Sequence, residues 1–296
     1  MSPCQPRDSN TSDPAGRSWC VPPLSRPIEG ARRRRVMNGV VGLETPRSGL
    51  ALPAPRMLER EPGRAFPRVR IGHVPLDMGR LSEVLQSIEG LVAGGQGGRI
   101  VTPDVEQVAL AQEHVALRES LSTADLSLAG GEALVRAARV IGSPLPEERA
   151  GAEWLPAMAG LASARGWRVL VVAERPGVAE WTACVLRERY RLVAVGVAVP
   201  GVPADGRGPW VDRLLERMAL TRPDLVLVSM ATPKQELFCQ YAAGRLNSAV
   251  LVGTGEALES LVNGRRVSRP RQVLASLGRW VRRSVAFLRV LVMARR

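Results

Sequence analysis

Apolar and polar residues follow two patterns along this chain. Short unbroken apolar runs, such as 167–172 and 192–197, predict strands, because strands covered on both faces need not alternate apolar with polar residues. Between the runs lie stretches with apolar residues three and four positions apart, such as 81–92, which predict amphipathic helices. Strands that alternate with helices of about ten to fifteen residues indicate βαβ units and a largely parallel sheet.

The full set of predicted elements fits this scheme. Strands are predicted at 69–71, 99–102, 126–128, 167–172, 192–197, 225–230 and 249–252. Helices are predicted at 81–92, 105–117, 132–139, 154–164, 177–189 and 211–219, with a further helix after the strand 225–230. We therefore predict an α/β fold with a Rossmann-like, largely parallel sheet and helices on both faces. In such folds ligands bind beyond the carboxyl ends of the strands.

Three parts of the chain differ in composition. Residues 1–66 are rich in Pro, Ser, Arg and Gly without periodicity, which predicts a disordered Arg/Pro-rich tail. Residues 67–264 carry the strand and helix pattern and are predicted to form the α/β domain. Residues 265–296 contain ten arginines and no acidic residue, and their apolar positions follow helical spacing from 273 to 292. They are predicted to form a basic C-terminal helical appendage.

This appendage has the composition of a helix that lies in a membrane interface, with one tryptophan and a basic polar face. A terminal helix packed on its own domain is the alternative. Nucleic acid ranks third as a partner, because the apolar face is too continuous for a helix that must stay wet.

The stretch 222–236 carries the strongest local signal for a ligand. Its apolar run predicts a buried strand, after which Thr232 is predicted to cap a helix with Pro233 at the first position and Gln235 in a capping box. A helix N-terminus offers free N–H groups and a positive dipole end, and Lys234, the only lysine of the chain, stands there. The stretch therefore predicts a site for a phosphate-bearing ligand, with an ordinary capped helix as the alternative.

Polar and small residues follow two other predicted strands. Thr102 and Asp104 can present a hydroxyl and a carboxylate to the crevice, unless Asp104 simply caps the next helix. Gly130 and Gly131 allow a ligand to approach the backbone closely, or form a tight turn. Both pairs lie where an α/β sheet binds its ligands.

Two further candidates come from loops. Arg149 precedes a helix and can form a bidentate contact with a phosphate or carboxylate, with an ordinary surface arginine as the alternative. Gly253 and Gly255 form a small Gly-rich turn that is compatible with phosphate contact. No nucleophile–base arrangement and no Walker-type motif accompanies them.

Composition limits the partners. The formal net charge of +13 over 296 residues favours phosphates, nucleic acid or an acidic membrane surface. The four cysteines show no metal-ligand spacing and the two histidines are isolated, so no metal site is predicted. A reducing cytosol is the expected location, since no secretory signal is visible and no run approaches the ~20 apolar residues that span a bilayer.

The motifs together resemble the WecG/TagA/CpsF family of glycosyltransferases over residues 68–290. The matching segments are Arg99-Ile-Val-Thr-Pro-Asp, Ala124-Asp-Leu-Ser-Leu-Ala-Gly-Gly, Glu148-Arg-Ala-Gly, Pro233-Lys-Gln-Glu, Val252-Gly-Thr-Gly, Gly264 and Pro270. The resemblance implies an inverting, metal-independent transfer of a sugar such as N-acetylmannosamine from a UDP-sugar to a polyprenyl-diphosphate-linked sugar, without a cofactor. It also implies that the C-terminal appendage docks on the membrane and completes the active site.

Two positions depart from the family pattern. The family's proposed general base is an Asp after the third strand, and the aligned residue here is Gly130. The family's Thr-x-Asn is here Thr102-Pro-Asp104. An inverting transfer needs a group that takes the proton of the acceptor hydroxyl, which contributes about 10²–10⁴-fold in rate. Asp104 is the first candidate for a relocated base and Glu132 the second.

The expected protein is thus a glycosyltransferase of cell-surface polysaccharide synthesis, cytoplasmic and peripheral on the inner face of the cell membrane. The residues expected to bind substrate are Thr102, Gly130, Gly131, Arg149, Lys234, Gln235, Gly253 and Gly255. The alternative is a catalytically inactive relative, favoured by Gly130, that binds a nucleotide sugar or lipid diphosphate as an adaptor. The oligomeric state is left open, a homo-oligomer included.

Overall fold

A computed structural model describes residues 65–143, 145, 154–175, 177–246, 248–255, 257–258, 261, 286 and 289–290, all within one compact unit. Nearly all of the predicted tail at 1–66, Arg149 and most of the appendage at 265–296 lie outside the described residues. Phe66 is described, and its ring is buried in the main core.

The described strands form two sheets. Six strands make one sheet in the order β4-β3-β8-β7-β5-β6, and each neighbouring pair in it is parallel. Its strands are β3 (Gly98–Val101), β4 (Leu126–Ser127), β5 (Arg168–Ala173), β6 (Val193–Ala198), β7 (Leu225–Ser229) and β8 (Val250–Gly253). A separate antiparallel hairpin consists of β1 (Arg68–Ile71) and β2 (Val74–Asp77). The predicted parallel sheet is confirmed.

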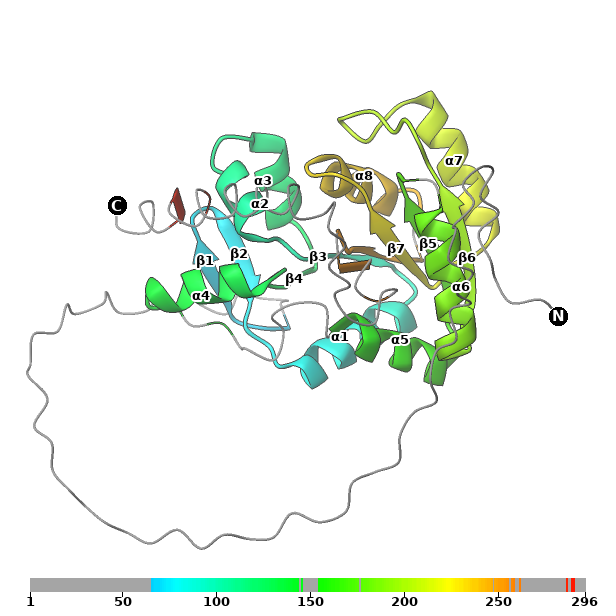
Figure 1. The fold of residues 1–296 in the computed structure, drawn as a ribbon, viewed down its shortest axis with the longest axis horizontal. Coiled ribbons are helices and arrows are strands. Elements are labelled where there is room, and N and C mark those ends of the chain that lie inside the picture. The colour runs from blue at the N-terminus through cyan, green and yellow to red at the C-terminus, as the bar shows by residue number, and fades with distance from the viewer. Residues whose placement is uncertain are drawn as a thin grey trace, which may run out of the picture. The chain divides into compact units, whose positions relative to one another are not determined.

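Helices cover both faces of the six-stranded sheet (Figure 1). They are α1 (Leu81–Ala93), α2 (Val105–Leu110), α3 (Val115–Ser122), α4 (Glu132–Val140), α5 (Trp154–Arg165), α6 (Val178–Tyr190), α7 (Pro209–Leu220) and α8 (Lys234–Ala243). Successive side chains of a strand point to opposite faces, so Val169 and Val171 pack with α1, α5 and α6, while Leu170 and Val172 pack with α7 and α8. The strands therefore read as unbroken apolar runs, and the predicted α/β fold is confirmed.

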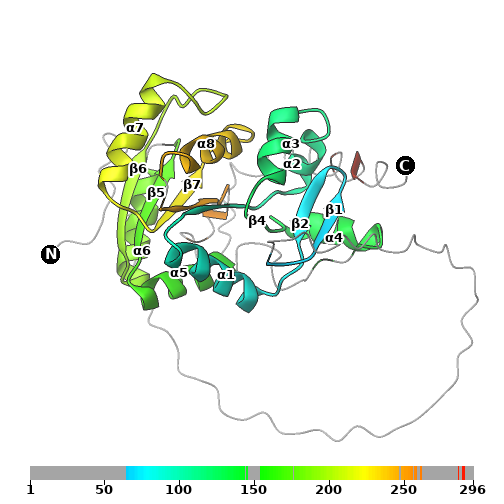
Figure 2. The same ribbon diagram turned by 180° about the vertical axis from the view of Figure 1, so that it is seen from behind.

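The hairpin β1–β2 lies at the β4 end of the sheet, beside α4 and far from α6 and α7 (Figure 2). Asp77 joins the two sheets: its carboxylate accepts the side chain of Arg68 at 2.8 Å and the backbone N–H of Ser127 at 2.6 Å. Arg68 and Asp77 are both buried, and buried charges are tolerated when they are paired and hydrogen-bonded in this way. The hairpin thus holds β4 and the turn that follows it.

Three described residues come from the predicted appendage. Ala286 and Val290 are helical and buried in the same cluster as the hairpin and helices α2 to α4. Arg289 lies 3.9 Å from Glu113, and both side chains are exposed, so this pair contributes little stability. At these positions the chain packs on its own domain. No helix in the described part of the chain is both long and apolar enough to cross a membrane.

Two elements differ from the prediction. The helix predicted at 105–117 is wrong as a single element, because α2 ends at Leu110 and His114 caps α3 by accepting the N–H of Leu117 at 3.1 Å. Strand β2 was not predicted, because Pro75 is a poor strand residue. Both strands of the two-stranded sheet are edge strands, and an edge strand tolerates a proline, which has no N–H to donate.

A polar crevice at the carboxyl ends of the central strands

The candidate site lies where β3, β8 and β7 end, and this polar region is called the crevice below. These three strands are neighbours in the sheet, although β3 lies about half the chain away from the other two in sequence. The hydroxyl of Thr102, directly after β3, donates to the carbonyl of Gly253 at the end of β8 at 2.7 Å. Two of the predicted site residues, from the ends of the neighbouring strands β3 and β8, are therefore in direct contact.

Asp104 begins helix α2. Its carboxylate accepts the N–H of Gln107 at 2.8 Å, and the side chain of Gln107 in turn accepts the N–H of Asp104 at 3.0 Å. This is a capping box, which satisfies two helix N–H groups reciprocally. Asp104 therefore caps the helix and lies, half-buried, at the crevice at the same time.

Gly130 and Gly131, after β4, differ in the space around them. The N–H of Gly130 donates to the carbonyl of Pro103 at 2.8 Å, which draws the two strand ends together. A Cβ atom at Gly130 would lie 2.1 Å from the carbonyl oxygen of Thr102, a distance that real Cβ contacts do not show. At Gly131 the backbone is extended and a Cβ would meet no atom within 4 Å. Position 130 therefore has no room for a side chain, whereas position 131 does.

Helix α8 begins one residue later than predicted, at Lys234, with Pro233 at its N-cap and no side-chain cap bond. Thr232 is not the cap, and this prediction is wrong. Its hydroxyl instead accepts the side-chain amide of Gln107 at 2.6 Å. The predicted capping box does not form, because the side-chain oxygen of Gln235 accepts the backbone N–H groups of two other residues.

Gln235 joins the turn after β7 to the turn after β8. Its side-chain oxygen accepts the N–H groups of Met230 at 3.3 Å and of Gly255 at 3.0 Å. Gly253 permits this close approach, because a Cβ there would lie 2.9 Å from the amide nitrogen of Gln235. Gln235 is only 3% exposed, so its carboxamide holds the two turns together from within the protein.

Sequence reasoning missed the pair Gln107 and Glu236. The amide of Gln107 donates to the Glu236 carboxylate at 2.7 Å, and the amide of Gln235 donates to the same oxygen at 2.9 Å. Burial raises the pKa of Glu236 to about 7. Hydrogen bonds from its own backbone N–H and from the two amides oppose the rise in pKa, and the negative charge of Asp104 adds to it. The sequence did contain one usable signal, since Asp104-x-x-Gln107 is itself a capping-box pattern.

The other predicted residues lie apart from this network. Lys234 is ion-paired with Glu174 at 2.5 Å, and both side chains are partly exposed. Glu132 is exposed on the first turn of α4 and pairs with Arg136 at 2.5 Å. Arg149 lies outside the described residues.

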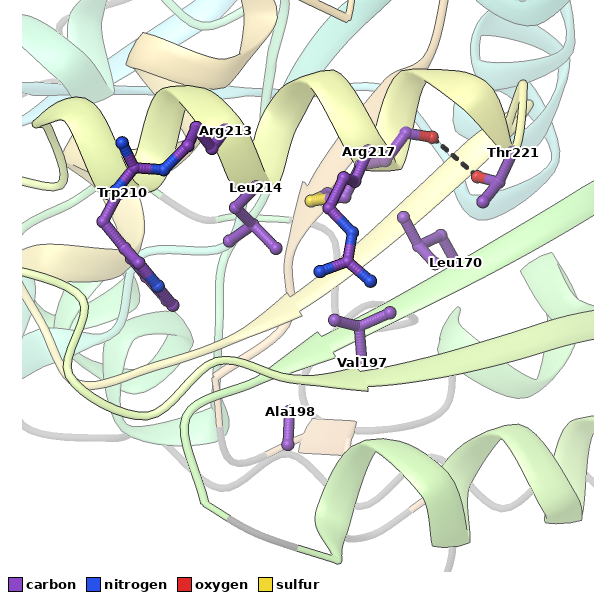
Figure 3. Close-up of a pocket in the computed structure, with 9 residues that line it drawn as sticks. Leu170, Val197, Ala198, Trp210, Arg213, Leu214, Arg217 and Thr221 are labelled. Atoms are coloured by element: carbon purple, nitrogen blue, oxygen red, sulfur yellow. Dashed lines mark hydrogen bonds between the residues drawn. The ribbon is translucent and has the colours of Figure 1, made fainter.

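A groove of about 550 Å³ runs between α7 and strands β5 and β6. Its floor includes Leu170 and Val197, and Trp210 and Arg217 extend over it from α7 (Figure 3). The hydroxyl of Thr221 donates a hydrogen bond to the carbonyl of Met218 at 2.7 Å. None of the candidate residues that the structure describes lines this groove, so the crevice and the groove are separate features.

The arrangement of the sheet and its turns indicates a general class of protein. A parallel sheet with glycine turns and a helix N-terminus at the carboxyl ends of its central strands is the architecture of α/β proteins that bind nucleotides and related phosphate ligands. The description "Glycosyl transferase WecG/TagA/CpsF family" belongs to the family model that matches residues 69–286. The chain therefore belongs to this family and is a glycosyltransferase, which confirms the resemblance seen in the sequence.

Relatives with an assigned activity occur in Staphylococcus aureus. An N-acetylglucosaminyldiphosphoundecaprenol N-acetyl-beta-D-mannosaminyltransferase of strain NCTC 8325 / PS 47 is 24% identical over 205 residues, which cover 67% of this chain and 77% of the relative. Proteins of the same name from strains COL and MRSA252 match with the same identity and coverage.

Proposed function

We propose that the protein transfers a sugar resembling N-acetylmannosamine from a UDP-sugar to a polyprenyl-diphosphate-linked N-acetylglucosamine acceptor, with inversion and without a metal ion or cofactor. The relatives' names supply the acceptor and the sugar. The observation that carries the proposal is the hydrogen-bonded network at the carboxyl ends of β3, β7 and β8, in which Thr102 contacts Gly253 while Gln235 holds Gly255.

In this proposal the two sides of the crevice have different tasks. The turns that contain Gln235, Gly253 and Gly255 bind the donor, with Lys234 adding a positive charge nearby. Thr102 and the backbone of Gly130 and Gly131 hold a sugar, and Arg149 binds a diphosphate.

Asp104 is the proposed base that takes the proton of the acceptor hydroxyl. It is half-buried and follows β3, whose end lies next to the turn at Gly130 after the neighbouring strand β4. Glu132 is the second candidate, one residue beyond the open position at Gly131.

The test is transfer from UDP-N-acetylmannosamine to a lipid-diphosphate acceptor with Asp104→Asn. Asparagine caps a helix as well as aspartate does, so this change removes the carboxylate while α2 keeps its cap. We expect a loss of about 10²–10⁴-fold in the transfer rate, the usual contribution of a general base. Full activity in Asp104→Asn together with a loss in Glu132→Gln would move the base to Glu132.

One observation favours a second function. The resemblance implies a base at position 130, where this chain has Gly130 and no carboxylate, and a side chain would have no room there. A protein without that group can bind a nucleotide sugar as an adaptor. Calorimetric binding of UDP-N-acetylmannosamine by the wild-type protein, with no turnover on any lipid-linked acceptor, would establish the adaptor instead of the enzyme.

The proposed place of action is the cytoplasmic face of the cell membrane, with the basic residues of 265–296 against anionic lipid. Replacement of Arg279, Arg282 and Arg283 by Gln should weaken sedimentation with anionic vesicles, because each basic residue near the surface contributes about 1 kcal/mol. Arg118 is on the domain itself, so Arg118→Gln is the control for each of the three single replacements. Equal sedimentation of the triple variant and the wild type would exclude this surface.

A further inference from the structure

Glu236 is a buried acid with an unusual set of neighbours. The residue is 3% exposed, and one carboxylate oxygen, Oε1, accepts two side-chain amides, from Gln107 at 2.7 Å and from Gln235 at 2.9 Å. The other oxygen, Oε2, is buried and has no hydrogen-bond partner in the part of the chain that the structure describes. An acid in the core of a helix end would ordinarily be replaced by an apolar residue, since an unpaired buried oxygen is costly.

The two amides come from opposite sides of the crevice. Gln107 is fixed to Asp104 through the capping box at the start of α2. Gln235 is fixed to the turn after β8 through the N–H of Gly255. A single carboxylate oxygen thus joins the helix turn that carries the proposed base to the turn that carries the proposed donor site.

We propose that Glu236 is a positioning residue: its ionised carboxylate holds the amides of Gln107 and Gln235 and so fixes the two sides of the crevice relative to each other. The proposal deepens the proposed function and rests on it only for its activity measurement. Glu236 itself does not touch the reacting atoms.

Only a carboxylate at this position satisfies both amides strongly. An ionised carboxylate accepts hydrogen bonds without donating, and bonds to it are roughly twice as strong as bonds between neutral groups. The second N–H of Gln107 is already used by the Thr232 hydroxyl at 2.6 Å. The carboxamide of Gln107 is therefore held in one orientation, and it links Asp104 to Glu236.

The charge of Glu236 changes near neutral pH. Burial is the main cause that raises its pKa to about 7, and Asp104 raises it further. Cys239 on α8 interacts electrostatically with Glu236, and burial raises the pKa of its thiol, so the thiol stays neutral. The buried Arg99 interacts electrostatically with Cys239 as well. Loss of the charge weakens the two amide bonds, so activity should rise as the pH passes upward through about 7.

Stability has the opposite dependence. The carboxyl holds its proton up to about pH 7 in the folded protein, against 4.5 for an ordinary glutamate. Between these values the folded state binds more protons than the unfolded state, so this group makes stability fall as the pH rises from 4.5 to 7. The charge that orders the crevice therefore lowers the stability of the fold.

Two variants separate the roles of the carboxylate. Glu236→Gln keeps an oxygen for both amides, places an –NH₂ group at the unpartnered Oε2 position and cannot titrate. Glu236→Leu removes the acceptor and leaves both amides without it. Glu119→Gln, at an exposed position of α3, is the matched control.

For activity, we expect Glu236→Leu to lose about 100-fold in kcat with a smaller change in KM, as for a misplacement of catalytic groups by about 1 Å. The wild-type rate should rise through an ionisation near pH 7 that is missing from Glu236→Gln and present in Glu119→Gln. Wild-type kcat in Glu236→Leu, or the same ionisation in Glu236→Gln, would overturn the proposal.

A second measurement does not depend on activity. Hydrogen exchange of the Gly255 amide, which donates to Gln235, should accelerate at least 10-fold in Glu236→Leu relative to the amide of Val171 in the sheet core. In Glu236→Gln it should lie between the wild-type and Glu236→Leu rates, because the amide oxygen still accepts both bonds but carries no charge. If the wild-type protein transfers no sugar but these exchange rates change as expected, the proposed function fails and the positioning role stands. Unchanged exchange at Gly255 in Glu236→Leu refutes the positioning role whatever the activity.

Discussion

The two sides of the crevice are built on different principles. At the α8 side, the carboxamide of Gln235 accepts two backbone N–H groups, so a side chain organises the turns around it. At the β4 side, Gly130 packs against the Thr102 carbonyl and only backbone atoms meet. A side-chain network can be tuned by substitution, whereas a backbone contact admits only glycine. The β4 side therefore cannot accept a new side chain at Gly130.

The largest expected effect comes from testing that limit with Gly130→Asp. The new Cβ would meet the Thr102 carbonyl at 2.1 Å, and backbone must move to relieve the contact. We expect the free energy of unfolding to fall by more than about 3 kcal/mol, the upper range for overpacking. Urea denaturation measures this change.

Gly131→Asp is the matched control. Its backbone is extended, which any residue can adopt, and a Cβ there meets nothing within 4 Å. We expect a change within about 0.5 kcal/mol, as at ordinary surface positions. A Gly130→Asp protein as stable as Gly131→Asp would remove the contrast between the two sides.

A smaller effect is expected where the two sides meet. Thr102→Val keeps the shape of the side chain but removes the bond to the Gly253 carbonyl, which should cost about 1 kcal/mol in unfolding free energy. Thr182→Val is the control, because the buried Thr182 hydroxyl has no partner among the described residues and its loss should cost nothing. Equal costs for the two substitutions would show that the Thr102 bond does not join the sides.

The sequence predicted the fold better than the site. Strands β5 and β7 were readable because parallel strands covered on both faces are continuous apolar runs. Gln107 was missed because its partners, Thr232 and Glu236, are 125 and 129 residues away, and no local pattern reports such a contact. Thr232 was assigned as a helix cap because the local pattern favoured it.

The misread helix and the misread cap share one physical cause. Local propensity assigns Gln235 to a capping box, but in the structure the Gly255 N–H, 20 residues away, takes its oxygen. In the same way His114 caps α3 and divides what periodicity reads as one helix. Polar side chains that can serve two purposes are where sequence patterns fail, and these side chains surround the crevice.

The order of strands has a consequence for synthesis. Strand β8 lies between β3 and β7, yet it is the last strand of the sheet in sequence. In a chain emerging from the ribosome, β3 can pair with β4, and β5 can pair with β6 and β7. The edges of β3 and β7 stay unpaired until β8, which ends at residue 253, has been made. Pairings over such long separations form slowly, and open edges favour association with other chains. The crevice therefore forms late in synthesis, when the four residues of β8 pair with β3 on one side and with β7 on the other.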